Sequence, residues 1–457
     1  MGNSPQPGSP ICKPLRILCL AHRVPHPPNR GYRIRSFHLL QFLARRATVD
    51  LAFLTHEPLA EASRAALQSM CRRVAWAPLH PWGRWLSGAR SLIVGKSVTE
   101  GAFRSARLRS QLAAWSGATR YDAVFVFCSS MVPYLEVMAA GPGETAPAGG
   151  PGCPVWVDLV DVDSQKWLEY AASARGLKRW LYAWEARRLR HLEKTLAGRV
   201  QTVTLVSSSE AALYRQVLGT HAEADRAVRR PTREEGTASP SCQIVPLPNG
   251  VDLEFFRPAP ASPVSAQPPV GPDVGERGKP AGAIVFVGAL DYPANIDGID
   301  WFCRHVWWPV RQRYPDLRLE IVGSQPGPAI RRWTRLPGVE LVGQVPDVRP
   351  HLAAALVVIV PLRIARGIQN KVLEAMAMGK PVLASPGALE GLHVQIPQQA
   401  ACASTPEEWL HTLGNLLGDP EERARLGAAG RAYVEQHHGW EPCLAGLEVL
   451  LSELEAR

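Results

Sequence analysis

Short apolar runs recur along the chain and alternate with segments of helical pattern. The runs are continuous rather than alternating, which is typical of parallel strands that are covered on both faces. The charged and aromatic segment 165–198 predicts one long helix. We expect strands at residues 16–21, 48–55, 121–129, 155–162, 202–208, 243–249, 283–289, 318–324, 339–345, 356–362 and 381–385.

This alternation is interrupted by residues 258–281, which are rich in Pro, Gly, Ala and Ser. Such a composition predicts a flexible linker. Strand–helix alternation on both sides of it predicts an α/β fold with two Rossmann-like, doubly wound domains that face a central cleft. The expected parts are a disordered tail at 1–14, a first domain at 15–257 on which a C-terminal helix at 440–457 packs, the linker at 258–281, a second domain at 282–439, and surface loops at 140–154 and 221–241.

Composition supports two folded domains and suggests an anionic partner. Of the 457 residues, 46% are hydrophobic and 20% are charged, which is enough for two cores and excludes global disorder. The net charge of +10 favours phosphate, a phospholipid surface or nucleic acid, although a solvated Arg-rich surface explains it equally well. No motif that reads nucleic acid interleaves the basic residues, so we do not expect a nucleic-acid partner.

The cysteine pattern and the N-terminal sequence indicate in which cellular compartment the protein is expected. The nine cysteines are scattered without C-x-x-C spacing, which predicts neither a zinc site nor a dithiol motif and suits a reducing compartment. The N-terminus lacks an apolar signal core, and the longest apolar run, "LAAALVVIVPL", is far short of the ~20 residues of a spanning helix. We expect a cytoplasmic protein, either free or peripheral at the cytoplasmic face of the inner membrane.

The first predicted strand leads into "HRVPHPPNRGYRIRS" rather than into a G-x-G-x-x-G or P-loop sequence. Arg30 and Gly31 stand before a predicted helix, with Arg33 and Arg35 nearby. A glycine-containing loop that opens a helix can hold a phosphate through backbone N–H groups and the helix dipole. The alternative is an ordinary loop with solvated arginines.

A second candidate lies in "VWVDLVDVDSQKW", which carries Asp158, Asp161 and Asp163 at the end of a predicted strand. Asp161 and Asp163 would share a face in extended backbone. Neighbouring carboxylates can act as general acid or base, or can bind a divalent cation. The alternative is that Asp163 or Ser164 caps the following helix.

The stretch "RGIQNKVLEAMAMGKPVL" predicts a helix over 368–378 that ends at Gly379. Arg366 and Lys371 stand near its N-terminus, where cations oppose the helix dipole, and Glu374 lies among apolar residues. Burying that carboxylate is costly unless another group satisfies it. The alternative is a surface pair between Lys371 and Glu374, whose i,i+3 spacing permits it.

Several separated motifs in one order resemble a known family. "RGIQNKVLEAMAMGKPVLAS", "PNGVDLEFF" and "VGQVPDVRPHL" look like the retaining GT-B glycosyltransferases of group 1, which are family 4-like. "AHRVPHPPNRGYRIRSFHLLQFL", "VDLVDVDSQKW" and "FVGALDYPANIDGIDWF" resemble more narrowly the sugar transferases of bacterial PEP-CTERM/exosortase exopolysaccharide systems. The resemblance covers residues 16–455.

The resemblance implies roles for individual residues. Glu374 would accept hydrogen bonds from the donor ribose, the cations would hold the diphosphate, and either Asp161 or Asp163 would act on the acceptor hydroxyl. The base would lie near Val345 and Asp347. The residues expected to contact the donor are Arg30, Gly31, Gly288, Asn295, Val345, Arg366, Gly367, Lys371 and Glu374.

The chain also departs from the family pattern at two positions. Arg366 stands where many members carry the first Glu of an E-x7-E pattern. The usual Arg after the first strand of the second domain is missing, and Gly288, Asp291 and Asn295 stand there instead. The donor sugar is therefore undefined by the sequence.

The function implied by the resemblance is transfer of a sugar from a UDP- or GDP-sugar to an acceptor hydroxyl, with retention of anomeric configuration. The acceptor would be a lipid-linked glycan of exopolysaccharide biosynthesis, and neither a cofactor nor a metal ion would be required. Two alternatives stay open: a sugar-nucleotide epimerase of the same fold, and a non-catalytic nucleotide-binding scaffold.

Overall fold

The computed structural model describes residues 14–79, 97, 103–138, 152–228, 242–258 and 282–456. Almost all of the predicted tail and linker, and most of the predicted loops at 140–154 and 221–241, lie outside the described residues. The chain forms two compact units. The first domain comprises Met1–Thr204, Arg215–Val245 and Leu447–Arg457, and the second comprises Leu205–Tyr214 and Pro246–Gly446.

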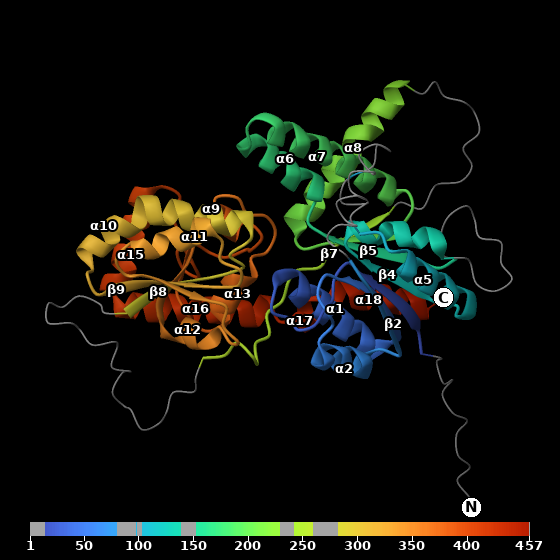
Figure 1. Cartoon of the computed structure of the whole chain (residues 1–457), viewed down its shortest axis with the longest axis horizontal. Coiled ribbons are helices and arrows are strands. Elements are labelled where there is room, and N and C mark those ends of the chain that lie inside the picture. The colour runs from blue at the N-terminus through green and yellow to red at the C-terminus, as the bar shows by residue number, and fades with distance from the viewer. Residues whose placement is uncertain are drawn as a thin grey trace, which may run out of the picture. The chain divides into compact units, whose positions relative to one another are not determined.

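A seven-stranded sheet forms the centre of the first domain, with strand order β3-β2-β1-β4-β5-β6-β7. β1 pairs in parallel with both β2 and β4, and β2 is buried along almost its whole length, as the apolar runs predict. Figure 1 shows these strands flanked by helices. The strands are Arg16–Ala21 (β1), Thr48–Thr55 (β2), Arg73–Pro78 (β3), Ala123–Phe127 (β4), Val155–Val160 (β5), Thr202–Leu205 (β6) and Gln243–Pro246 (β7).

The helices of the first domain connect these strands. They include a 3-10 helix directly after β4 and a pair of antiparallel neighbours after β5. α8 begins within the second domain and continues in the first. The helices are Gly31–Arg46 (α1), Glu61–Met70 (α2), Ala106–Ala118 (α5), Ser129–Val137 (η1), Asp163–Ser173 (α6), Gly176–Ala197 (α7), Ser208–Val228 (α8) and Ala445–Glu455 (α18).

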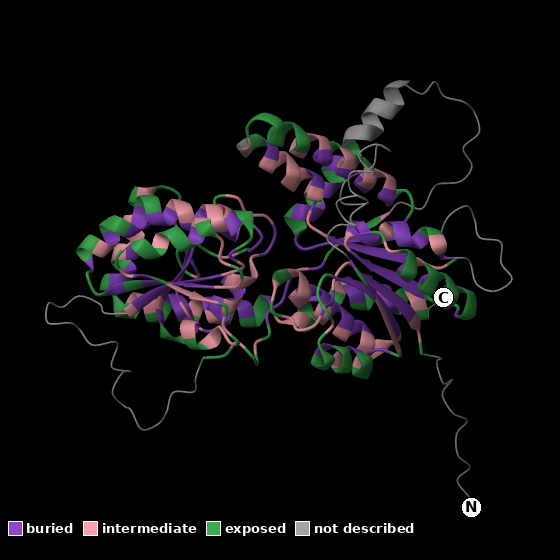
Figure 2. Ribbon diagram, viewed as in Figure 1, coloured by how far each residue is buried: buried purple, intermediate pink, exposed green. Residues whose placement is uncertain are grey.

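The second domain repeats the plan with a six-stranded sheet of order β10-β9-β8-β11-β12-β13. Its central strands are buried, as Figure 2 shows in purple. β8 pairs in parallel with β9 and β11. The strands are Gly282–Val287 (β8), Leu317–Val322 (β9), Val339–Gly343 (β10), Ala355–Val360 (β11), Val382–Ala384 (β12) and Ala401–Cys402 (β13).

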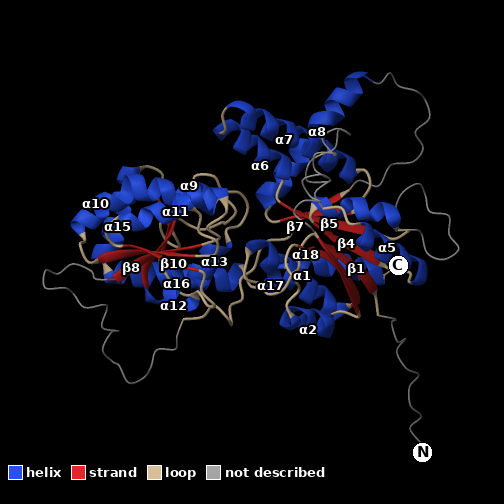
Figure 3. Ribbon diagram, in the orientation of Figure 1, coloured by secondary structure: helices blue, strands red, loops and turns tan. Residues whose placement is uncertain are grey.

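Helices surround the strands of this domain as well (Figure 3). The longest, α16, packs on α13. They are Pro293–Phe302 (α9), Cys303–Trp307 (η2), Trp308–Arg313 (α10), Pro328–Arg331 (α11), Arg332–Arg335 (η3), Arg349–Ala354 (α12), Asn370–Ala377 (α13), Pro386–Leu389 (α14), Pro406–Gly418 (α15), Pro420–His437 (α16) and Trp440–Cys443 (α17). No helix in the described part of the chain is long and apolar enough to cross a membrane.

The strand order reverses direction between β1 and β4 in one sheet and between β8 and β11 in the other. Ligands of doubly wound sheets bind outside the carboxyl ends of the strands at such a reversal. The residues that follow β1, β4, β8 and β11 are therefore the places to look for a site in each domain.

The segment 165–198 was predicted as one helix, and that prediction is wrong. The structure has two helices, α6 and α7, which pack against each other. The break lies at Gly176, whose φ of 60° is in the left-handed region that glycine adopts without strain.

The helix that was predicted to start at residue 368 ends where the sequence predicts, before Gly379. Gly379 has φ 66°, and its N–H and that of Lys380 donate to the carbonyls of Met376 and Ala375.

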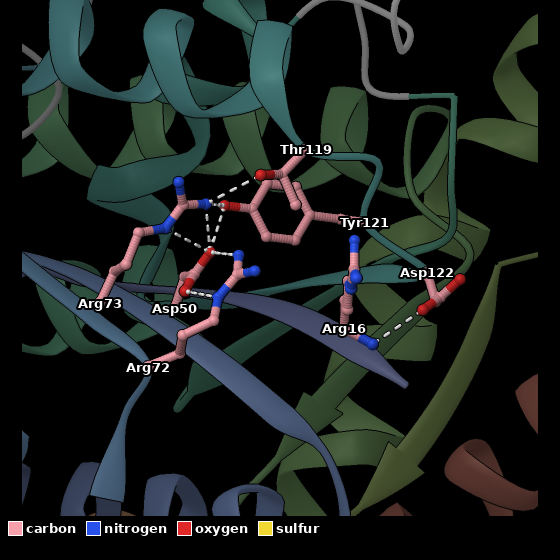
Figure 4. A network of polar contacts seen from close by, with 7 residues as sticks. All are labelled: Arg16, Asp50, Arg72, Arg73, Thr119, Tyr121 and Asp122. Atoms are coloured by element: carbon pink, nitrogen blue, oxygen red, sulfur yellow. Dashed lines mark hydrogen bonds and ion pairs between the residues drawn. The ribbon is translucent and has the colours of Figure 1, made fainter. Parts of the chain in front are cut away.

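A polar network stabilises the first domain near the amino ends of its strands (Figure 4). The buried Asp50 of β2 accepts hydrogen bonds from Arg72, Arg73 and Tyr121. Burial alone would raise the pKa of Asp50, but these hydrogen bonds outweigh it and hold that pKa below its ordinary value. The network is thus a structural one, because it lies at the end of the sheet opposite to the carboxyl edge.

The last helix, α18, belongs to the first domain, where Glu448 forms an ion pair with Arg46 of α1. The preceding helix, α17, belongs to the second domain. There Trp440 lies so close to Gly250 that a Cβ at position 250 would meet the indole ring at 2.8 Å.

Candidate functional site

The reversal point of the second sheet holds a group of polar residues. The ammonium of Lys371 in α13 donates to Oδ1 of Asn295 in α9 at 2.6 Å. Asn295 is buried and donates to the carbonyl of Ala289 at 2.7 Å. Gly288 directly follows β8 and lies against both side chains, because a Cβ there would be 2.9 Å from Lys371 Nζ and 2.9 Å from Asn295 Nδ2. The structure therefore brings together the predicted residues Gly288, Asn295 and Lys371.

Lys371 and Glu374 are electrostatically coupled on α13, and both are half-buried. Burial lowers the pKa of Lys371 to about 7, although Glu374 opposes this shift. Burial likewise raises the pKa of Glu374 to about 7, against the effect of Lys371. The Lys371 ammonium also lies 4.5 Å from the ring centroid of Phe286. Both charges are held in protein surroundings, which contradicts an exposed surface pair.

The turn before α13 depends on glycine. Gly367 has φ 61°, and a Cβ on Gly391 would meet the Gly367 carbonyl oxygen at 2.7 Å. α13 begins at Asn370, two residues later than predicted, because Gln369 is still extended. Gln369 makes no side-chain cap hydrogen bond to the helix, and its amide donates to the Arg366 carbonyl instead. The side chain of the N-cap residue thus does not satisfy the first N–H groups of α13.

Arg366 is tied to a residue that the sequence did not indicate. Its guanidinium lies 3.3 Å from a carboxylate oxygen of Glu210, a buried residue of α8 that belongs to the same domain. Asn249 was also missed as a side chain of the site. It follows β7 and donates to Asn370, the first residue of α13, at 2.9 Å. The quoted motif "PNGVDLEFF" contains Asn249 and was the available signal.

The loop predicted to lie near the base has its own internal bonds. Asp347 accepts from the backbone N–H of Arg349 at 2.9 Å and from the Arg349 guanidinium. These hydrogen bonds hold the pKa of Asp347 below its ordinary value. Arg349 lies over the ring of Phe255 at 3.9 Å, and Val345 is half-buried. Asp347 therefore organises the start of α12.

In the first domain, Arg30 is the N-cap residue of α1 and Gly31 is its first, exposed residue, so the predicted loop does open a helix.

Arg35 of α1, unlike the residues of this loop, is buried. It is 1% exposed and forms two hydrogen bonds, of 2.8 and 2.6 Å, to Asp158 of β5, which is 0% exposed. Thr204 donates to the same carboxylate at 2.7 Å. Arg35 and Asp158 are a buried structural pair, which corrects their interpretation as site candidates.

Asp161 and Asp163 follow β5 at the carboxyl edge. Val160 before them has φ 69°, an uncommon conformation for a β-branched residue. Asp163 is the first residue of α6 and accepts from Lys166 at 2.8 Å. The alternative that Asp163 or Ser164 is the N-cap residue of α6 is wrong, because Val162 is.

The cap of α6 comes from another helix. The N-cap residue is Val162, whose apolar side chain cannot accept a hydrogen bond from the helix. Glu193 of α7 instead accepts from the Ser164 N–H at 2.9 Å and from its hydroxyl at 2.5 Å. Glu193 thereby anchors α7 to the start of α6.

Sequence reasoning missed a cluster at the reversal point of the first sheet. His22 follows β1, and its ring stacks on Phe127 of β4 with centroids 5.6 Å apart. The ring centroids of Tyr32 and His22 are 5.9 Å apart, and the Arg23 guanidinium carbon lies 4.8 Å from the Tyr32 ring centroid. The hydroxyl of Ser129, which is 2% exposed, and Nδ1 of His22 have no hydrogen-bond partner among the described residues. Buried polar atoms of this kind are suited to a polar ligand.

The protonation of His22 follows from its surroundings. Burial, assisted by the charges of Arg23 and His56, lowers the pKa of His22 to about 3. The imidazole is therefore neutral at physiological pH and offers one donor and one acceptor. The available signal was the run "HRVPHPP" directly after the first strand.

A family of known proteins matches a large part of the second domain. Residues 281–419 match the family model for glycosyl transferases group 1. This segment contains Gly288, Asn295, Val345, Arg366, Gly367, Lys371 and Glu374.

Curated relatives resemble parts of the chain. D-inositol 3-phosphate glycosyltransferase of Segniliparus rotundus is 28% identical over 282 residues, which are 56% of this chain and 59% of that protein. A GDP-mannose-dependent phosphatidylinositol monomannoside mannosyltransferase of Mycolicibacterium smegmatis is 28% identical over 51% of this chain and 63% of its own. The chain thus spans less than two thirds of the length of the curated relatives it matches.

Solved structures resemble nearly the whole chain. Sucrose-phosphate synthase from Thermosynechococcus elongatus superposes with a TM-score of 0.64 at 16% identity, covering 96% of this chain and 99% of its own. Anabaena Alr3699/HepE in complex with UDP and glucose has a TM-score of 0.60 at 14% identity and covers 96% and 100%. With two Rossmann-like parallel-sheet domains and these neighbours, the fold is GT-B.

Proposed function

We propose that this protein is a glycosyltransferase that moves a sugar from a nucleoside-diphosphate sugar to an acceptor hydroxyl. The observation that carries the proposal is the position of the Lys371–Asn295–Gly288 group. It lies at the strand-order reversal of the second sheet, inside the segment that matches the glycosyltransferase family model. A doubly wound domain binds its nucleotide at this position.

The donor diphosphate is proposed to bind Lys371 and the first turn of α13, assisted by Arg366 and the backbone at Gly367. An anion suits the N-terminus of α13, and a bound diphosphate would favour the charged form of Lys371 that burial disfavours. Glu374 would accept hydrogen bonds from two ribose hydroxyls, because a carboxylate is acceptor-only. Asn295 and Gly288 shape the floor of the site, and the base lies near Val345. We propose UDP or GDP as the nucleotide, since Alr3699/HepE is described with UDP and the mannosyltransferase relative as GDP-mannose-dependent.

In the proposed reaction the acceptor oxygen bonds to the anomeric carbon, and the bond from that carbon to the diphosphate oxygen breaks. The acceptor proton passes to Asp161 or Asp163, or to the departing diphosphate. Lys371 and Arg366 stabilise the negative charge that develops on the leaving group. We propose same-face attack with retention of anomeric configuration, without a cofactor or a metal ion.

The acceptor is proposed to be a lipid-linked glycan of a bacterial exopolysaccharide pathway, of the PEP-CTERM/exosortase kind. The mannosyltransferase relative is described as acting on a phosphatidylinositol mannoside, which supports a lipid acceptor. In the first domain, His22, Ser129 and the Arg30–Gly31 loop offer polar groups for it. The protein would then work at the cytoplasmic face of the inner membrane.

A panel of UDP-, GDP-, ADP- and dTDP-sugars tests the function directly. A true donor at 100 times its Kd stabilises the folded chain by about 2.7 kcal/mol, which raises the melting temperature by several degrees. The same donor should yield free nucleoside diphosphate only when an acceptor is present, and Asp161→Ala or Asp163→Ala should slow that step. Sugar conversion without acceptor would favour the epimerase, and donor binding without turnover would favour the scaffold.

Donor binding should also be linked to protons, with a sign that reverses near pH 7. At about pH 8.5 Glu374 is ionised and Lys371 is mostly neutral, so a bound diphosphate should draw up to one proton onto Lys371. At about pH 5.5 Lys371 is charged and Glu374 is protonated, so ribose hydroxyls should release up to one proton from Glu374. Calorimetry of nucleotide-sugar binding in buffers of different ionisation enthalpy measures the number of protons taken up at pH 8.5 and released at pH 5.5.

The matched control for this linkage is Lys371→Met, which keeps the length of the side chain and removes its charge. The variant should lose the proton uptake at high pH. Equal uptake by the wild type and Lys371→Met would contradict the contact between Lys371 and the diphosphate.

A further inference from the structure

The turn between α6 and α7 exposes large apolar side chains at one place. Leu177 is 81% exposed, Trp180 is 62% exposed and Leu181 is 38% exposed. All seven residues of 175–181, which we call the α6–α7 tip, are exposed (green in Figure 2). An exposed tryptophan between two exposed leucines is unusual for a surface that faces only water.

The charges around this tip have one sign. Arg175, Lys178 and Arg179 are exposed within it, and residues 171–184 contain no acidic residue. The two acids of α7, Glu185 and Glu193, are 3% and 2% exposed and so contribute little to the surface. The tip therefore presents apolar side chains together with cations only.

Contacts between α6 and α7 hold the two helices together behind the tip. Trp167 of α6 contacts Tyr182 of α7 with ring centroids 5.2 Å apart, and Glu193 binds the first turn of α6 through Ser164. α6 has 11 residues, which separates the tip from the end of β5 by about 16 Å of helix.

We propose that the α6–α7 tip docks on an anionic phospholipid bilayer. Leu177, Trp180 and Leu181 enter the boundary between headgroups and acyl chains, and the cations contact the phosphates of the headgroups. Pairing of this tip with the same tip of a second copy would set cation against cation, so charge complementarity favours the bilayer. The inference deepens the proposed lipid-linked acceptor, yet it stands on the residues of the tip.

Vesicle flotation with the full-length protein tests the docking. Binding is expected to phosphatidylcholine vesicles that contain a quarter phosphatidylglycerol, and it should be weaker to phosphatidylcholine alone or at high salt. Lys178→Gln with Arg179→Gln should weaken binding to the anionic vesicles roughly 30-fold. The triple serine variant of Leu177, Trp180 and Leu181 should weaken it at least as much.

Matched controls come from exposed residues elsewhere. Trp308, which is 48% exposed, is changed to Ser, and Arg257, whose side chain is 67% exposed, is changed to Gln. Both should bind vesicles like the wild type. Brominated lipids should quench tryptophan fluorescence in the wild type and less in Trp180→Phe, which reports contact of the tip itself.

The possible results separate this inference from the proposed function. Tip variants that bind nucleotide sugar normally but lose vesicle binding support it. It is overturned if the wild type ignores anionic vesicles, if the tip variants bind them unchanged, or if the variants alter only the oligomeric state in light scattering. Vesicle binding without any donor binding would instead overturn the glycosyltransferase proposal alone.

Discussion

Glu374→Ala is expected to weaken binding of the nucleotide-sugar donor by at least about 100-fold and to abolish measurable transfer. The carboxylate would receive two hydroxyl hydrogen bonds, and hydrogen bonds to a charged group contribute about 1.5–3 kcal/mol each. The substitution also leaves Lys371 without its opposing charge, because the two residues are coupled on α13. Titration calorimetry with the donor identified by the sugar panel measures the loss.

Two variants make this result interpretable. Glu374→Gln keeps the size of the side chain and one acceptor oxygen, so it should retain part of the affinity. Glu453→Ala removes an exposed carboxylate of α18 and should bind donor normally. Undiminished donor binding by Glu374→Ala, in a variant that melts like the wild type, would refute the ribose contact.

Asp158→Ala is expected to give the largest loss of stability, about 3–5 kcal/mol. Arg35 and Asp158 are both almost completely buried, and they meet through two hydrogen bonds. Removing the carboxylate leaves a buried guanidinium without compensation and also removes the acceptor of Thr204. Denaturant unfolding followed by circular dichroism measures the change.

The contrast within the same domain is Asp163→Ala, which breaks a partly exposed pair with Lys166. That change should cost at most about 1 kcal/mol. The double variant Arg35→Met with Asp158→Leu should be more stable than Asp158→Ala, because no charge stays buried. If Asp158→Ala costs no more than Asp163→Ala, the buried pair does not stabilise the fold as argued.

The strands were predictable because their signal is local. The run predicted at 356–362 forms β11 over Ala355–Val360, and that predicted at 48–55 forms β2 over the same residues. The break at Gly176 was missed, because a single glycine inside a helical pattern is often tolerated. A sequence shows its apolar periodicity, but the conformation of one glycine depends on the packing of α6 on α7.

The candidate site was predictable only where its residues are close in sequence. Lys371 and Glu374 stand three apart, but Asn295 lies 76 residues before Lys371, and Glu210 lies 156 residues before Arg366. Arg35 and Asp158 are 123 residues apart, so the sequence alone offered two site candidates where the fold has one ion pair. Such pairs follow from strand order, which one sequence does not specify.

The division of the chain also limits how this protein can be cut into pieces. The chain changes domain after Thr204, Tyr214, Val245 and Gly446. A fragment that starts at residue 282 would carry Leu447–Arg457 without Arg46, and would leave Arg366 without Glu210. Expression of the second domain alone would therefore require a redesigned tail and a grafted segment rather than a simple truncation.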